Sequence, residues 1–371
     1  MAEIVLKMEL GKIDNNFIEM QHLNLTDVVL TDVRDLPVDI YGFYDIKNER
    51  AFKRMPDGVA KSLGEGISKL YLDTAGGRIR FCTDSPYVAI KVSFPHISRN
   101  SMMTSMNVCG FDLYENFPAS GASRYVGSFD TGARPEVENG YEAVIRFGDC
   151  KMRYLTLNFP HYSHVDRLLL GVSKASVIGR GMAYANKRPV LFYGSSITQG
   201  ACASRPGNSY ENMISRRFNL DYINLGFSGN AKGEPEIAEY MSGLSMCAFV
   251  CDYDHNAPDA PHLLKTHEAL YRKIRQNNPE IPYIIMSRPN FDVNYRQSVL
   301  RRDAIYKTFL NGFGEGDSNL YYIDGAGIFN GEYEDCCTVD KTHPNDLGFM
   351  YIAESISGVI KRAMSDGAVF E

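Results

Sequence analysis

The chain of 371 residues exceeds the usual size of a single hydrophobic core, so we expect two domains. Hydrophobic residues make up 44% and charged residues 23% of the sequence, which is ordinary for a globular protein and argues against extensive disorder. The formal net charge of -6 comes from interspersed acids and bases, which argues against nucleic acid and anionic membranes as partners.

The N-terminus and the cysteines bear on the cellular compartment. The segment MAEIVLKMEL (residues 1–10) lacks the apolar core of a signal peptide, and no stretch is long enough to span a bilayer. Of the 8 cysteines, several lie in apolar runs, and no spacing forms the paired CxxC of a zinc site. The sequence therefore predicts a cytoplasmic protein with reduced structural thiols and no structural zinc.

The first half of the chain contains short segments rich in β-branched and aromatic residues, separated by turn residues. Helix-length periodic segments are scarce there, which is typical of a β-sandwich. The expected strands are SKLYLDT (68–74), GRIRFCTD (77–84), YVAIKVSF (87–94), FDLYEN (111–116), SRYVGSFD (123–130), YEAVIRF (141–147) and RYLTLNFP (153–160).

After GMAYANKRP (181–189) apolar strands alternate with longer helical segments. This alternation predicts a parallel sheet with helices on both faces and a site at the carboxyl ends of its strands. We therefore expect a jelly-roll-like β-sandwich over 1–185 and an α/β domain over 186–371. The expected strands are VLFYG (190–194), DYINLG (221–226), CAFVCDY (247–253), PYIIMSRP (282–289) and LYYIDGAG (320–327), and the clearest helices cover 209–218, 260–276 and 346–364.

Ser196 follows the first strand of the expected α/β domain, in VLFYGSSITQG. A glycine at a strand tip permits a sharp turn, which can place the next serine in the crevice at the edge of the sheet. Serine is also favoured at turns and helix N-caps, so this pattern alone leaves both interpretations open.

The segment TVDKTHPNDLGF places Asp340 three residues before His343, ahead of the last helix. A serine nucleophile needs a general base, and an imidazole base needs an acceptor that fixes its tautomer. Pro344 disfavours a helical conformation at His343, so we expect this histidine in the loop at the site. Gly229, through its backbone N–H, and Asn256, through its side-chain amide, are candidate oxyanion donors in the loops after the second and third strands.

The blocks GSSITQG, NLGFSGN, DYDHNAP and DKTHP resemble those of the SGNH (GDSL-type) hydrolases, and GFDLYEN resembles the GxDLY segment of the β-sandwich that precedes some SGNH domains. The resemblance implies a flavodoxin-like domain with Ser196 as nucleophile, His343 as base and Asp340 as its orienting acid. It also implies an oxyanion hole formed by the backbone N–H of Ser196 with Gly229 and Asn256. Ser195 stands where the family usually has aspartate, and DYDHN replaces the usual Gly-x-Asn-Asp.

Two further polar groups invite a metal interpretation. His161 and His164 in HYSH lack an accompanying carboxylate cluster, and we interpret that segment as a surface loop at a strand tip. Asp252, Asp254 and His255 end the third strand, where we expect them to shape the site or satisfy loop backbone. No cofactor and no bound metal are predicted.

The predicted function is a serine esterase that cleaves short acyl esters, acetyl first, of a carbohydrate or small metabolite. GFDLYEN and the sandwich are expected to supply extra surface for the alcohol part of such a substrate. An acyltransferase would share every catalytic residue, and a carbohydrate-binding protein with an inactive hydrolase domain is a third hypothesis. The sequence leaves open whether the chain forms a homo-oligomer.

Overall fold

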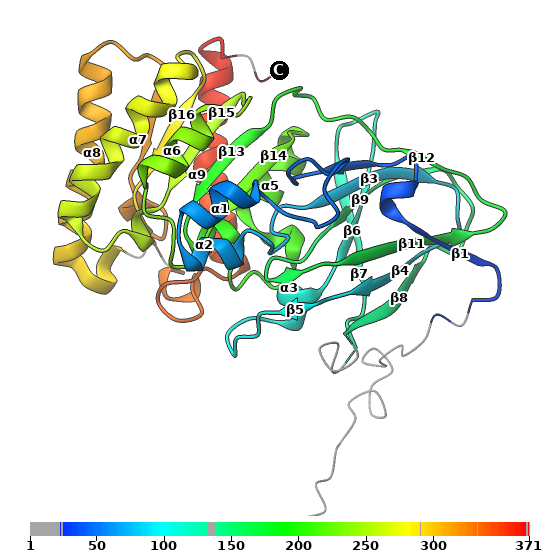
Figure 1. The fold of residues 1–371 in the computed structure, drawn as a ribbon. Helices are drawn as coiled ribbons and strands as arrows, with labels where there is room; N and C mark the ends of the chain where they lie inside the picture. Colours follow the sequence, from blue (N-terminus) through cyan, green and yellow to red (C-terminus); the bar gives the residue numbers. More distant parts are fainter. Residues whose placement is uncertain are drawn as a thin grey trace, which may run out of the picture.

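The structure is a computed structural model, and it describes residues 23 and 25–370 apart from 133–138, 290, 332 and 369. The signal-peptide argument rests on residues 1–10, which lie outside the described part, so the compartment stays a prediction. Figure 1 shows two units side by side, a set of antiparallel sheets and a parallel sheet with its helices. We call the part containing β1–β12 the sandwich unit and the part containing β13–β17 the parallel-sheet unit.

The sandwich unit has two main antiparallel sheets that enclose one hydrophobic core. One sheet has the strand order β1-β11-β4-β8, and the other has the order β12-β3-β9-β6-β7 with β2 paired to β3. Alternate residues such as Ile79, Phe81, Val88 and Ile90 fill the core between the sheets. The strands are β1 (Val28–Asp32), β2 (Asp39–Tyr41), β3 (Arg78–Thr83), β4 (Tyr87–Ser93), β5 (His96–Ile97), β6 (Asp112–Asn116), β7 (Ser123–Ser128), β8 (Gly140–Arg146), β9 (Arg153–Asn158), β10 (Ser163–His164), β11 (Arg167–Ser173) and β12 (Ile178–Arg180).

The parallel-sheet unit has five strands in the order β14-β13-β15-β16-β17, all paired in parallel. Numbered from the first strand of this unit, the order is 2-1-3-4-5, the flavodoxin-like arrangement, whose ligands bind at the carboxyl ends of the strands. The predicted α/β fold with a preceding antiparallel β domain is therefore confirmed. The strands are β13 (Val190–Gly194), β14 (Tyr222–Gly226), β15 (Ala248–Asp252), β16 (Tyr283–Met286) and β17 (Leu320–Ile323).

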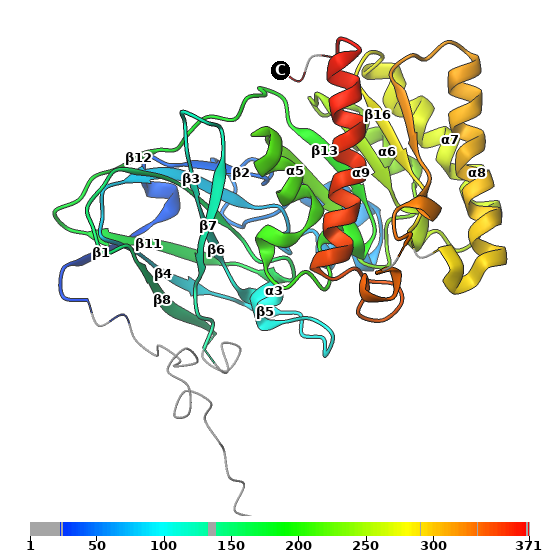
Figure 2. The ribbon, with the colours of Figure 1, turned by 180° about the vertical axis from the view of Figure 1, so that it is seen from behind.

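Helices cover both faces of the parallel sheet, and alternate residues of β13 point to different sides. Val190 and Phe192 pack with α5 (Tyr210–Phe218) and α9 (Asp346–Ser365), which Figure 2 shows in front of the sheet. Leu191 and Tyr193 belong to the core on the other face. That face is covered by α6 (Pro235–Ser242), α7 (Ala260–Asn277) and α8 (Tyr295–Gly314).

One predicted strand is wrong. Residues 68–74 form no strand: α2 (Glu65–Leu70) occupies the start of the segment, after the short α1 (Asp57–Ser62). The apolar residues Ile67 and Tyr71 belong to the core on one face of the parallel sheet, although they lie within the first half of the chain. A short apolar segment is ambiguous between strand and helix, and tertiary packing decided between the two.

No helix among the described residues is long and apolar enough to cross a membrane. All eight cysteines are free thiols, and four of them are fully or almost fully buried: Cys109, Cys247, Cys251 and Cys337.

Candidate active site

Ser196 lies at the first position of the short helix α4 (Ser196–Gln199), directly after β13. Ser195 is buried and caps this helix, because its Oγ accepts a hydrogen bond from Ile197 N at 3.1 Å. Gly194 leaves no room for a side chain, since a Cβ there would lie 2.1 Å from Thr198 Oγ1 and 2.3 Å from the carbonyl oxygen of Asp252. The sequence left open whether Ser196 is a helix cap or a nucleophile. Ser195 caps α4, so the Oγ of Ser196 is not used as the cap.

His343 connects Ser196 to Asp340. Ser196 Oγ lies 2.9 Å from His343 Nε2, and His343 Nδ1 lies 2.8 Å from Asp340 Oδ2. With the Nδ1–H donating to the carboxylate, Nε2 is left as the acceptor for the serine hydroxyl. The structure thus brings together the three residues that the sequence analysis named as nucleophile, base and acid.

Asp340 also shapes the turn that carries His343. Its Oδ1 accepts hydrogen bonds from the backbone N–H groups of Thr342 at 3.0 Å and His343 at 2.7 Å, and Lys341 between them has φ +68°. Burial raises the pKa of Asp340, but the hydrogen bonds from His343 and Thr342 outweigh it and leave the pKa below its usual value. Asp340 therefore stays ionised beside the imidazole.

The loop after α4 is tied to the start of α9. Asp346 Oδ1 accepts from Ser204 N at 2.8 Å, and its Oδ2 accepts from Ser204 Oγ at 2.5 Å and from Asn208 Nδ2 at 2.8 Å. Because His343 lies three residues before Asp346, these bonds fix the histidine loop against the segment that follows the serine.

Gly229 and Asn256 lie in the loops after β14 and β15, the two neighbours of β13. Gly229 has φ +70°, while a Cβ there would meet nothing within 4 Å, so the backbone conformation explains this glycine better than lack of space. Asn256 Oδ1 accepts from Ala231 N at 3.2 Å, which leaves the amide nitrogen to donate. Both groups therefore stand at the same edge of the sheet as Ser196.

Arg301 on α8 holds the loop that contains Asn256. It donates to the carbonyl oxygens of Asp254, Ala257 and Pro258, each at 2.8 Å, and NH1 lies 3.2 Å from Asp254 Oδ1. The other carboxylate oxygen of Asp254 accepts from Arg288 N at 3.0 Å. Asp254 thus accepts a hydrogen bond from a backbone N–H group of a neighbouring loop. This is one of the two roles that the sequence analysis expected for it.

Asp252 is fully buried at the end of β15, where Thr198 Oγ1 donates to its Oδ2 at 3.3 Å. Burial, and then the nearby Asp254, raise the pKa of Asp252 well above its usual value. Across the described ranges, no three His, Cys, Asp or Glu side chains are arranged to hold a metal ion.

His255 is electrostatically coupled to His343. Its pKa is lowered to about 3 by burial, then by the positive charge of Arg288 and the proximity of His343. The Nε2 of His255 is buried, with no hydrogen-bond partner among the described residues. His255 is therefore held in its neutral form.

Two protein-family models match the chain. Residues 187–361 match the GDSL-like lipase/acylhydrolase family, and residues 28–178 match the N-terminus of SGNH hydrolase-type esterases that contains GxDLY. The chain belongs to the GDSL-like (SGNH) hydrolases. No match was found among curated proteins.

Several solved structures have the same fold. A GDSL-like lipase described as putative, from Bacteroides ovatus, is 28% identical, with 90% of this chain and 98% of that chain covered and a TM-score of 0.79. The salicylyl-acyltransferase SsfX3 of a tetracycline biosynthetic pathway is 17% identical, with 93% and 100% covered and a TM-score of 0.73. A family two carbohydrate esterase from Clostridium thermocellum, in complex with cellohexaose, is 13% identical, with 78% and 93% covered and a TM-score of 0.57.

The HYSH segment of this hydrolase is not a surface loop. His161 is buried and its Nδ1 lies 3.2 Å from Gly200 O, at the end of α4. Tyr162 OH lies 2.6 Å from Ser228 Oγ and donates to Ser196 O at 3.4 Å. Burial lowers the pKa of His161 to about 4, so it is neutral in the fold. The prediction was wrong because a single sequence shows strand ends without showing what covers them.

The GFDLYEN segment is likewise buried instead of exposed to substrate. Asp112 is fully buried and its Oδ2 accepts from Gly207 N at 2.7 Å and Arg205 NH1 at 2.8 Å. Tyr114 is also buried and accepts from the same guanidinium. The segment therefore anchors the loop after α4 to the sandwich unit, and the buried side chains of Asp112 and Tyr114 offer no surface to a substrate.

Sequence analysis did not identify the polar residues behind α4. Gln199 Oε1 accepts from Ser228 N at 3.0 Å, while its Nε2 donates to Asp73 Oδ2 at 2.9 Å. Asn107 Nδ2 donates to Gly200 O and Ala203 O, each at 2.7 Å. These buried bonds hold the serine helix and the Gly229 loop against the sandwich unit, and no pattern in the sequence marks their partners.

Proposed function

We propose that this hydrolase is a serine esterase in which Ser196 is the nucleophile, His343 the general base and Asp340 the acid that orients it. The two hydrogen bonds of 2.9 Å and 2.8 Å that join these residues carry the proposal. A serine hydroxyl is a weak nucleophile until a positioned base accepts its proton, and the base needs an acceptor on its other nitrogen.

The proposed oxyanion hole consists of the backbone N–H groups of Ser196 and Gly229 and the side-chain amide of Asn256. The N-terminal position of Ser196 in α4 supports this role, because N–H groups in the first turn of a helix have no partner within the helix. The fixed Oδ1 of Asn256 supports its orientation as a donor.

In the proposed reaction, Ser196 Oγ attacks the ester carbonyl as its proton passes to His343 Nε2. The negative charge that develops on the carbonyl oxygen is stabilised by the three donors. The protonated imidazole then gives its proton to the leaving alkoxide, and the alcohol departs. A water molecule attacks the acyl-enzyme with His343 again as base, which releases the acid and restores the serine.

The proposed substrate is a short acyl ester, acetyl in the first instance, of a carbohydrate or small metabolite. The loops after β13, β14 and β15 support a small acyl pocket, since they consist mainly of small, polar and proline residues: TQGACASRPGNS, SGNAKGEP and DHNAPDAP. The carbohydrate part rests on analogy with the Clostridium thermocellum esterase, with which this chain shares the fold.

An acyltransferase is the second candidate function, favoured by the fold similarity to the salicylyl-acyltransferase over nearly the whole chain. It would use the same acyl-enzyme and transfer the acyl group to a bound alcohol in place of water. We also propose that the domain boundary falls at residues 185 and 186, between the two family matches.

The mutant pair Ser196→Ala and Ser195→Ala tests the nucleophile with p-nitrophenyl acetate as substrate. Ser196→Ala is expected to lower kcat by about 10³-fold or more, because the covalent route is lost. Ser195→Ala removes a helix cap and is expected to cost about 1 kcal/mol of stability with a much smaller loss of kcat. An active Ser196→Ala enzyme would overturn the assignment, and an inactive wild type would favour the carbohydrate-binding hypothesis.

The length of the acyl group and the identity of the acyl acceptor are tested in separate experiments. We expect p-nitrophenyl acetate to be cleaved much faster than the octanoate, and a preference for octanoate would contradict the short-acyl proposal. Product analysis with and without acetylated oligosaccharides and candidate alcohols distinguishes hydrolysis from transfer, since only transfer yields a new ester.

A further inference from the structure

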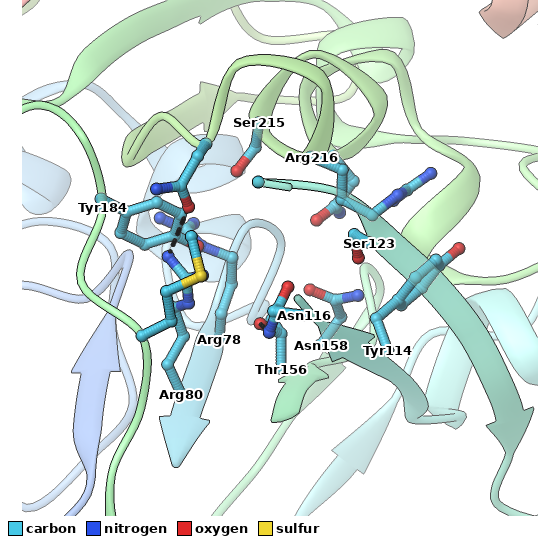
Figure 3. Close-up of a pocket in the computed structure, with 14 residues that line it drawn as sticks. Arg78, Arg80, Tyr114, Asn116, Ser123, Thr156, Asn158, Tyr184, Ser215 and Arg216 are labelled. Atoms are coloured by element: carbon cyan, nitrogen blue, oxygen red, sulfur yellow. Dashed lines mark hydrogen bonds between the residues drawn. The ribbon is translucent and has the colours of Figure 1, made fainter. Parts of the chain in front are cut away.

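A small cavity lies between the two units, away from Ser196 (Figure 3). Strands β3, β6 and β9 of the sandwich unit form one side, and α5 of the parallel-sheet unit forms the other. Asn219, which lines it, comes shortly before the amino end of β14, whereas Ser196 follows the carboxyl end of β13. The cavity is therefore separate from the candidate active site.

Three arginines line this cavity, and only one of them has a carboxylate partner of its own. Arg78 forms an ion pair with Asp221 and also donates to Tyr184 OH at 2.8 Å and Tyr222 O at 3.1 Å. These bonds account for its charge, so Arg78 and Asp221 together are neutral.

Arg80 is almost fully buried and forms no ion pair within the part of the chain that the structure describes, although Asp221, the partner of Arg78, also acts on it electrostatically. Its NH1 donates to Asn219 Oδ1 at 3.0 Å, and the guanidinium lies 4.1 Å from the ring centre of Tyr184. Its Nε is buried without any hydrogen-bond partner there. Burial lowers the pKa of Arg80, which reflects the cost of keeping this charge away from water.

Arg216 approaches the cavity from α5. Its NH1 donates to Gly207 O and its guanidinium lies 4.2 Å from the ring centre of Tyr114. Asp112, the carboxylate that acts on it electrostatically, is already paired with Arg205. The cluster of Arg78, Arg80, Arg205 and Arg216 therefore carries four positive charges against the two carboxylates of Asp112 and Asp221.

The neutral groups of the cavity add hydrogen-bonding capacity between the arginines. Figure 3 shows Ser123, Asn116 and Thr156 between Arg80 and Arg216. Ser123 Oγ is buried and has no partner among the residues described. Guanidinium groups with a hydroxyl donor are the set that proteins use to bind oxyanions.

The size of the cavity limits the ligand. The cavity volume is about 20 Å³, which is too small for a sugar ring. We propose that a small inorganic oxyanion, phosphate or sulfate, binds between Arg80 and Arg216 with Ser123 as a further donor, and links the two units. The ligand would supply the negative charge that this buried cluster lacks.

The test is a titration of the full-length protein, freed of phosphate and sulfate, with thermal unfolding and calorimetry as readouts. We expect phosphate or sulfate to raise Tm saturably, beyond the effect of sodium chloride at the same ionic strength. A rise no larger than that of chloride would overturn the proposal. Glucose 6-phosphate is expected not to bind, and binding as tight as that of phosphate would refute the inorganic ligand.

Variants locate the site. Arg80→Met and Arg216→Met keep the apolar stem and are each expected to weaken anion binding by about ten-fold or more, because a charge-assisted contact is lost. Arg124→Met is the matched control, since Arg124 adjoins Ser123 and changes the net charge equally but is exposed and paired with Glu115. If Arg80→Met fails to fold, Ser123→Ala tests the same cavity with a milder change. Unchanged binding in Arg216→Met and Ser123→Ala would overturn the assignment.

Discussion

His161 and Gly200 meet at the boundary between the two units. His161 Nδ1 lies 3.2 Å from Gly200 O, and an alanine Cβ at position 200 would lie 2.3 Å from the same nitrogen. Gly200 has φ +97° and ends α4, the helix that begins with Ser196. The lack of a side chain at Gly200 therefore lets the helix of the proposed nucleophile lie directly against His161 of the sandwich unit.

Gly200→Ala is expected to lower the free energy of unfolding by about 1–3 kcal/mol, because it combines backbone strain with a clash. It should also lower kcat, since relieving the clash moves α4. Gly58→Ala in the exposed helix α1 is the control: a Cβ there meets nothing within 4 Å, and stability should stay equal or rise. Urea unfolding and p-nitrophenyl acetate turnover measure both effects. Equal stability of the two variants would refute this account of Gly200.

The sequence placed Ser196 and His343 at one site because each residue stands close to a recognisable strand or helix boundary. Ser196 follows a buried strand and a glycine, and His343 stands just before Pro344 and the N-cap of α9. A parallel sheet brings all such strand ends to one edge, so order along the chain was enough to place them together.

The contacts between the units could not be predicted in the same way. Tyr162 and Asp112 lie in strand-rich segments that look like ordinary strand ends, and their partners are 66 residues away at Ser228 and 95 residues away at Gly207. Such pairings depend on how the sandwich unit packs against the parallel-sheet unit. The periodicity of residues within one segment does not encode that packing.

The neutral His255 leads to a prediction about pH dependence of activity. With its pKa lowered to about 3, His255 has no proton to lose above pH 4 and cannot cause the acid limb of the rate profile. We expect His255→Asn to keep the position of that limb and to lose about ten-fold or less in kcat/KM. His343→Asn should lose about 10³-fold or more. Profiles of kcat/KM from pH 4.5 to 8 decide this, and a displaced acid limb in His255→Asn would contradict it.

His267 on α7 gives a prediction for stability. Burial lowers its pKa to about 3, so between that value and 6.5 the unfolded chain binds a proton that the folded chain does not. The neutral His267 contributes fully to the free energy of unfolding above pH 6.5. This contribution falls by about 1.4 kcal/mol per pH unit as the pH decreases from 6.5 toward 3. The stability of His267→Phe should therefore fall less steeply with acid. Urea unfolding from pH 7.5 to 5 measures the two slopes, and parallel curves would show that His267 is not the cause.

A substitution of Asp112, the buried aspartate of GxDLY, tests whether this segment is a structural anchor or a substrate-binding surface. Asp112→Asn removes the negative charge that faces Arg205 and is expected to cost about 2–3 kcal/mol of stability. Because the loop it anchors adjoins α4, kcat should fall equally for p-nitrophenyl acetate and acetylated oligosaccharides. Glu115→Gln changes the next acid of the same strand, whose partner Arg124 is exposed, and should cost less than about 1 kcal/mol. A substrate surface would instead raise KM for oligosaccharides alone and leave stability unchanged, so that result in Asp112→Asn would restore the role expected from the sequence.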